Sequence, residues 1–132
     1  MSVKPEDFEK AIANYLENYV EDIEEEVKET TDTQIRKAKQ ELVTISPKGK
    51  SKRSNPYYRG WAVRTPKKGK HRYSRVIWNK TNYQLTHLLE FGHAKKDGTG
   101  WVEAQPHIRP TEEKYRIQFT ESLISKIRRQ KW

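Results

Sequence analysis

The residues best suited to chemistry lie between positions 90 and 107, where carboxylates and imidazoles follow one another along the chain. Glu90, His93, Asp97, Glu103 and His107 offer the oxygen and nitrogen ligands that divalent metal ions bind. A metal-dependent nuclease is therefore one hypothesis, with a nearby basic segment to hold DNA. The spacing does not favour it, because no two of the four histidines lie four residues apart and no His-Glu-x-x-His motif occurs. An ordinary polar loop is the stronger prediction.

The sequence argues against several other classes of protein. The sequence has no cysteine, which excludes disulfides, thiolate metal sites and cysteine nucleophiles. It contains no Gly-x-Gly-x-x-Gly and no Gly-Lys-Ser/Thr motif for a nucleotide cofactor. Its longest apolar runs are three residues, so we expect no membrane span, and the first residues do not predict a secretory signal.

Charge is distributed unevenly along the 132 residues, whose formal net charge is +9. Residues 1–32, the acidic segment, hold three basic and eleven acidic side chains, whereas residues 33–132 hold 24 basic and seven acidic ones. Within residues 33–80 there are fifteen basic side chains and a single acid. Such a block attracts polyanions, and the acidic segment can pair with basic surface on a neighbouring copy. The alternative is two solvated faces that keep the chain soluble.

A basic hairpin is the most suggestive functional feature of this block. Lys67, Lys68, Lys70 and Arg72 surround the expected turn, and we predict that they contact a partner or DNA. Aromatic residues flank them, and basic residues mixed with aromatic ones bind single-stranded nucleic acid by stacking. The alternative is that the aromatic rings pack on the helices while the lysines face water. The aromatic residues concerned are Tyr57, Tyr58, Trp61, Tyr73 and Trp78.

The N-terminal third of the sequence predicts one long helix over residues 5–43. Apolar residues recur there at steps of three and four, which is the period of an amphipathic helix. A break is conceivable at residues 30–33, where Thr31 and Gln34 match a capping box. We favour a single helix, kinked or continuous. Residues 46–56 contain no apolar residue and predict a flexible basic linker or loop.

The remainder, residues 57–132, predicts a small sheet and two helices. Tyr57–Thr65 and Arg72–Asn79 have strand-like alternation, and residues 66–70 supply a hairpin loop. A short helix follows, capped by Thr81 or Asn82 and stopped by Gly92.

The last part of the sequence reads as a loop over residues 93–109, then a final helix. A short strand is expected near residues 101–104 within the loop. The helix begins at Pro110 or Thr111, with acidic residues in its first turn and basic ones in its last. We expect a single α+β domain over residues 1–132, with the C-terminal helix packed on the sheet.

Two short motifs resemble a known family. Leu88-Leu89-Glu90-Phe91-Gly92-His93 and Ala104-Gln105-Pro106-His107-Ile108-Arg109-Pro110 are similar to elements of the small tailed-phage proteins typified by the tenth gene product of phage HK97. Members usually show Leu-Glu-Phe/Tyr-Gly-Thr and, after a variable loop, Ala-x-Pro-Phe-Leu/Ile-Arg-Pro-Ala before the last helix. His93, His107 and Thr111 replace the usual Thr, Phe and Ala. The resemblance covers about residues 57–128.

The resemblance implies a virion structural protein at the head–tail junction, made in the host cytoplasm. Such proteins act in the neck or in tail completion, form rings, commonly of six or twelve copies, and contact the adjoining connector and tail proteins. DNA passes through the channel and is a further candidate contact. The family implies no catalysis, no cofactor and no metal. The motif residues expected to shape the fold are Glu90, Phe91, Gly92, Pro106, Arg109 and Pro110.

Overall fold

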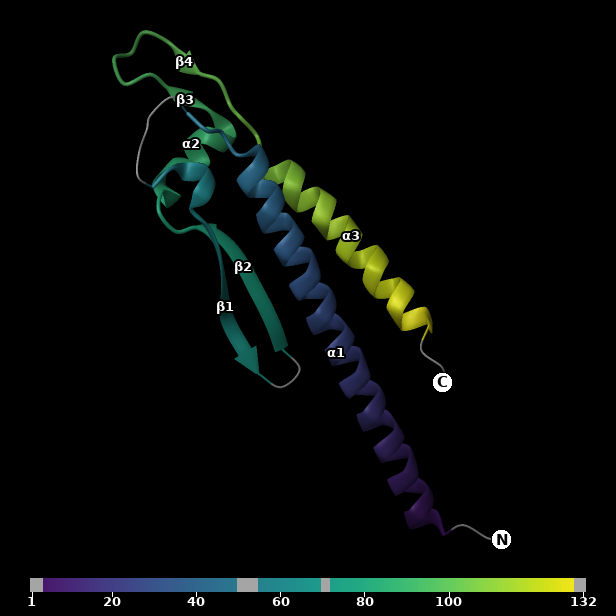
Figure 1. Cartoon of the computed structure of the whole chain (residues 1–132). Coiled ribbons are helices and arrows are strands. Elements are labelled where there is room, and N and C mark those ends of the chain that lie inside the picture. The colour runs from purple at the N-terminus through teal and green to yellow at the C-terminus, as the bar shows by residue number, and fades with distance from the viewer. Residues whose placement is uncertain (1–3, 50–54, 70–71, 130–132) are drawn as a thin grey trace.

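The computed structural model describes residues 4–49, 55–69 and 72–129. It confirms the α+β class, with a long helix flanked on one side by a β-hairpin and on the other by the C-terminal helix (Figure 1). The turn residues 70 and 71 and residues 50–54 of the expected basic linker lie outside the described part. The elements are α1 (Pro5–Ile45), β1 (Trp61–Gly69), β2 (Arg72–Asn79), α2 (Thr86–Phe91), β3 (His93–Ala94), β4 (Trp101–Val102) and α3 (Ile108–Arg129).

Helix α1 runs without a break through the stretch where a kink was conceivable. Pro5 occupies its first turn, where a missing N–H costs nothing. The expected capping box does not form, because the Thr31 hydroxyl donates to the carbonyl of Val27 at 2.7 Å, one turn back within the same helix. The helix ends at Ile45, and the N–H of Ser46 closes the last turn on Leu42 O at 2.9 Å.

The hairpin of β1 and β2 is antiparallel and longer than the sequence predicts. Part of the expected loop, residues 66–69, belongs to β1, because the strand accommodates Pro66 at an irregularity in its pairing. Residues 65 and 66 there lie opposite Arg75 alone, as in a β-bulge, which tolerates a proline. The first predicted strand also begins late, because Tyr57–Arg59 forms a 3-10 turn before Trp61.

Helix α3 packs antiparallel along α1 rather than on the hairpin, where we expected it (Figure 1). Its half-buried apolar side, which includes Tyr115, Phe119 and Leu123, meets a helix whose own stripe has the same 3.6-residue period. Lys114 Nζ lies 2.7 Å from Glu41 Oε1 and Lys126 Nζ lies 3.6 Å from Glu26 Oε2, which ties the two helices at both ends of the contact.

The middle of the chain departs from the prediction in three places. The short helix is preceded by a 3-10 turn, Tyr83–Leu85, without a side-chain cap. The polar loop contains a small hairpin, because β3 pairs antiparallel with β4. Helix α3 begins at Ile108, earlier than predicted. Among the described residues, no helix is both long enough and apolar enough to cross a membrane.

The core is small, as the composition suggests. Among the described residues, the buried apolar side chains are Ala38, Leu42, Tyr57 and Trp61, and partly buried neighbours surround them. This core sits where the C-terminal end of α1 meets the base of the hairpin and the start of α3. The first half of α1 extends away from it into solvent (Figure 1).

Candidate functional site

A buried carboxylate joins the two motifs that resemble the tailed-phage family. Glu90, near the end of α2, is 7% exposed, and its side chain reaches the first turn of α3. The backbone N–H groups of His107 and Ile108 donate to its Oε1, each at 2.9 Å, and the N–H of Arg109 donates to its Oε2 at 3.0 Å. Glu90 therefore caps α3 from outside the helix. We call this arrangement the Glu90 clasp.

The electrostatics of the clasp favour the charged carboxylate. Burial raises the pKa of Glu90, but the three backbone N–H groups of residues 107–109 and the nearby His107 ring lower it, and the net result is a pKa below the ordinary value. An anion at a helix N-terminus is stabilised by the same unpaired N–H groups and by the helix dipole. The clasp thus satisfies three donors that the start of α3 leaves open.

His107 is almost fully buried, with 1% of its surface exposed, at the position where the resembled family has Phe. Its Nδ1 lies 2.8 Å from Gln105 O and 3.3 Å from Glu90 Oε1. Because both neighbours are acceptors, Nδ1 carries a hydrogen. The Nε2 of His107 lies 2.7 Å from the Tyr57 hydroxyl oxygen, so the two groups share a hydrogen bond. The buried imidazole therefore has a hydrogen-bonding partner at each of its ring nitrogens.

The hydrogen-bonded network continues from His107 into the core. Tyr57 stacks edge-on against Trp61 with ring centroids 5.5 Å apart, and burial raises the pKa of the Tyr57 hydroxyl. Trp61 Nε1 donates to Ser46 Oγ at 2.7 Å, and Ser46 Oγ donates to Leu42 O at the end of α1. The clasp is thereby connected to α1, to the hairpin and to α3 through buried side chains.

Gly92 lets the chain leave α2 and reach β3. Its φ is +78° and its ψ is 172°, a conformation that side-chain-bearing residues rarely adopt. A Cβ at this position would lie 2.7 Å from Val102 O and 2.8 Å from Trp101 Nε1. Gly92 is therefore required both by its backbone angle and by the close approach of β4.

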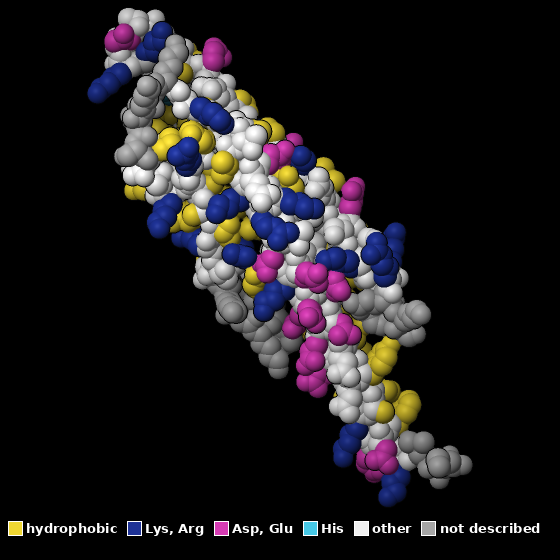
Figure 2. Space-filling view, viewed as in Figure 1, with side chains coloured by type: hydrophobic (Ala, Val, Ile, Leu, Met, Phe, Trp, Pro, Cys, Tyr) yellow, Lys and Arg dark blue, Asp and Glu magenta, His cyan; other side chains and the backbone are white. Residues whose placement is uncertain are grey.

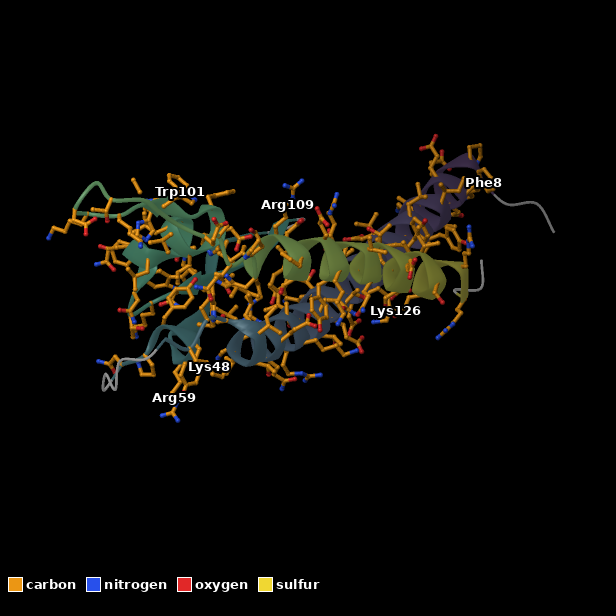
Figure 3. All side chains as sticks on the ribbon, turned by 90° about the horizontal axis from the view of Figure 1, so that it is seen from above. Phe8, Lys48, Arg59, Trp101, Arg109 and Lys126 are labelled. Carbon is orange, nitrogen blue, oxygen red and sulfur yellow. The ribbon has the colours of Figure 1, made fainter. Side chains whose placement is uncertain are left out.

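The other motif residues lie around the clasp with their side chains outward. Phe91 is 70% exposed, and Pro106 and Pro110 are also exposed. The Arg109 side chain points away from the body (Figure 3), and its Nε lies 3.3 Å from Glu113 Oε1. Only Glu90 and Gly92 of the six expected residues contribute buried or sterically restricted positions here.

The candidate metal ligands are not brought together in the described part of the chain. No group of three His, Asp or Glu side chains suited to a metal ion occurs among its residues. Glu90 is engaged by backbone N–H groups, and the Asp97 carboxylate accepts from the N–H and the hydroxyl of Thr99 at 3.0 and 2.6 Å.

The aromatic residues around the hairpin divide into two groups. Tyr57 and Trp61 are buried and belong to the core. Tyr58 is half-buried, with Lys48 Nζ 4.8 Å and Arg59 Cζ 5.4 Å from its ring centroid, and both labelled cations lie at the same end of the molecule (Figure 3). Arg64 Cζ lies 5.4 Å from the centroid of the Trp78 ring. A protein cation therefore lies over each of these two rings.

The structure gives no side-chain position for the predicted partner contacts. Lys67 and Lys68 lie in β1 and Arg72 begins β2, while Lys70 lies outside the described residues. Further along β2, Tyr73 donates to Asp32 of α1, and Arg75 Nη1 lies 3.0 Å from the same carboxylate.

Two features of this site were not predicted from the sequence. Tyr73 and Arg75 contact Asp32 from more than 40 positions away in the sequence, and no local pattern predicts these contacts. The sequence also did not predict that Tyr57 and His107 are buried. Compared with known family models, curated proteins and solved structures, the chain matches none of them.

Proposed function

We propose that this chain is a non-enzymatic structural protein of a phage or prophage virion. It acts at the head–tail junction, in head–tail joining, the neck or tail completion, and assembles through subunit interfaces into a ring. The observation that carries the proposal is the Glu90 clasp. A loop separates the two motifs of the resemblance in the sequence. The clasp accounts for both motifs together, because Glu90 of the first motif caps the backbone of the second.

The surface supports a role in assembly. Large apolar side chains are exposed along the first half of α1, and the buried core is small. A subunit with these properties gains stability from neighbours. The uneven charge also suits contact between different faces of two copies, which is the kind of contact that closes into a ring.

The alternative is a nucleic-acid-binding module that uses the hairpin of residues 57–80. It has less support, because Tyr57 and Trp61 are buried and cannot stack on bases. The basic residues of the hairpin suit either DNA in a channel or the acidic surface of an adjoining ring.

Size-exclusion chromatography with light scattering tests the proposal, over a concentration series at low and high salt. We expect a closed oligomer of about six or more copies, with rings visible by negative-stain microscopy. DNA binding is measured in parallel for the parent and for a variant with Lys67, Lys68 and Lys70 changed to Glu. A strict monomer that binds DNA, and loses that binding in the variant, would replace this proposal with the nucleic-acid module.

A further inference from the structure

The first half of α1 carries an apolar stripe that the described part of the chain does not cover. Residues 5–22, which we call the arm, extend beyond both the hairpin and α3 (Figure 1), and all except the half-buried Tyr19 are exposed. Along one side they place large apolar residues at helical spacing. The exposed fractions are 58% for Phe8, 44% for Ile12, 53% for Tyr15, 52% for Leu16 and 40% for Val20.

A groove of matching character lies elsewhere on the same chain. Helix α1, strand β2 and helix α3 enclose an open cavity of about 830 Å³. It extends from Thr31 to Leu42 along α1 and from Ile108 to Phe119 along α3. At 1.5 Å per helical residue both walls are about 16 Å long, and the stripe from Phe8 to Val20 is of similar length, about 18 Å. The apolar lining of the groove includes Ile35, Ala38, Leu42, Ile77, Tyr115 and Phe119.

Two polar atoms of the groove lining have no partner among the described residues. Gln34 is 8% exposed, and its Oε1 accepts no hydrogen bond there. Arg75 also lines the groove, and its Nε–H donates to nothing, although Nη1 is paired with Asp32. Both atoms are already buried within the single chain, so they give the groove wall a polar component beneath its apolar surface.

The distribution of charge along the chain indicates which segment occupies the groove. The arm holds six acidic side chains and one basic one, whereas residues 33–132 have 24 basic and seven acidic side chains. Figure 2 shows the acidic side chains gathered along α1 and the basic ones spread over the body. Two arms packed against each other would bring like charges together, while an arm in a groove of the basic body brings opposite charges together.

The groove cannot receive the arm of its own chain. Residues 31–42, which form one wall, belong to the same unbroken helix as the arm, and a continuous helix does not fold back on itself. We therefore infer that the arm of one copy docks, apolar stripe inward, in the α1–β2–α3 groove of a second copy. This deepens the proposed function and rests on it, since an arm and a groove on different parts of one chain form a head-to-tail contact.

Cross-linking between copies tests the docking directly, because the natural chain has no cysteine. One variant carries Leu16→Cys in the arm and the other carries Ser74→Cys, a nearly isosteric change in the groove lining. The two are mixed and treated with a short thiol-to-thiol cross-linker. We expect a covalent dimer in the mixture and little in either variant alone. A dimer formed by the arm variant alone indicates arm–arm packing, and either that result or no cross-link overturns the inference.

Assembly of matched arm variants supplies the second measurement. Ile12→Asp places a charge in the stripe, and Asn14→Asp places the same charge on the opposite side of the same exposed helix. We expect Ile12→Asp to raise the protomer concentration of half-assembly at least tenfold, since it removes a buried isoleucine from the contact, and Asn14→Asp to change it less than threefold. Equal behaviour of the two variants would refute docking of the stripe.

The two proposals fail in different ways. A closed ring that neither cross-links between arm and groove nor responds to Ile12→Asp overturns the docking and leaves the ring. A mixture that cross-links between arm and groove but yields only dimers or open filaments supports the docking and refutes the ring.

Discussion

Replacing Glu90 with glutamine tests the clasp with the smallest change in shape. Glutamine keeps one acceptor oxygen but turns the other into an NH₂ donor. If its carbonyl takes the place of Oε1, it still accepts from the N–H groups of His107 and Ile108. The new amide group then faces the N–H of Arg109, where two donors meet and one buried hydrogen bond is lost.

The expected cost follows from these three contacts. A hydrogen bond to a charged group contributes about 1.5–3 kcal/mol, and a neutral one roughly half of that. One bond is lost, at about 1.5–3 kcal/mol, and two are halved, together at about the same, so Glu90→Gln is expected to lower the free energy of unfolding by about 3–6 kcal/mol. Domains are typically stable by only about 5–15 kcal/mol, which makes this a large effect. Glu90→Ala removes all three acceptor contacts and leaves a cavity, and it is expected to cost more than the glutamine variant.

Urea unfolding followed by tryptophan fluorescence measures this difference, at one fixed protomer concentration so that assembly does not shift the result. Glu113→Gln is the matched control, because Glu113 has a half-exposed side chain that makes a single 3.3 Å contact with Arg109 Nε. It is expected to cost under about 0.5 kcal/mol. A loss of less than about 0.5 kcal/mol for Glu90→Gln as well would refute the capping role of Glu90.

Acid unfolding supplies an independent signature of the same clasp. The pKa of Glu90 is lower in the folded chain than its ordinary value of 4.5, so the folded state binds this proton less readily than the unfolded state. The stabilisation is therefore fully present above the ordinary pKa and is lost as the pH falls through the folded pKa. Glu90→Gln removes this group, so its stability is expected to fall less steeply than the parent's below about pH 4.5.

Three further predictions concern the supports of the clasp. Gly92→Ala is expected to lower the free energy of unfolding by more than about 2 kcal/mol, and Gly98→Ala, which has a similar φ of +77° but open space around it, by about 1 kcal/mol; equal losses in thermal unfolding would contradict this. Trp61→Phe leaves Ser46 without its donor and is expected to cost about 1–3 kcal/mol, and a double-mutant cycle with Ser46→Ala should show coupling between the two. Asp32→Asn is expected to cost under about 1 kcal/mol, because its side chain is 46% exposed, and urea unfolding in 1 M salt should abolish most of that loss.

The elements governed by local periodicity were predictable from the sequence. The steps of three and four over residues 5–43 predicted a helix that the structure extends only to Ile45. The hairpin was also predicted, but its loop was wrong because Pro66 and Gly69 were taken as turn residues. A bulge in the pairing lets the strand continue through that proline. Composition therefore located the hairpin without determining where the strands end.

The contacts of the candidate site were less accessible, because they join residues far apart in the chain. Glu90 was expected to shape the fold, but no local pattern shows that it caps a helix that begins 18 residues later. The predicted packing partner of α3 was wrong for a similar reason. An amphipathic stripe shows that one face of a helix is buried but not which element covers that face. His107 falls in residues 93–109, which were predicted as a loop, and its burial depends on partners from distant segments such as Tyr57 and Glu90.

The position of the core has a consequence for how assembly and stability are related. The buried apolar side chains and the Glu90 clasp hold together one end of the molecule, while the arm at the other end exposes its apolar stripe. Binding to the folded state adds stability in proportion to the logarithm of partner concentration. If the arm docks in a second copy, the unfolding midpoint must therefore rise with protomer concentration in the parent, and in Ile12→Asp the same rise must require at least tenfold higher concentrations. Glu90→Gln, in contrast, should lower the midpoint at every concentration, because the clasp acts within a single chain.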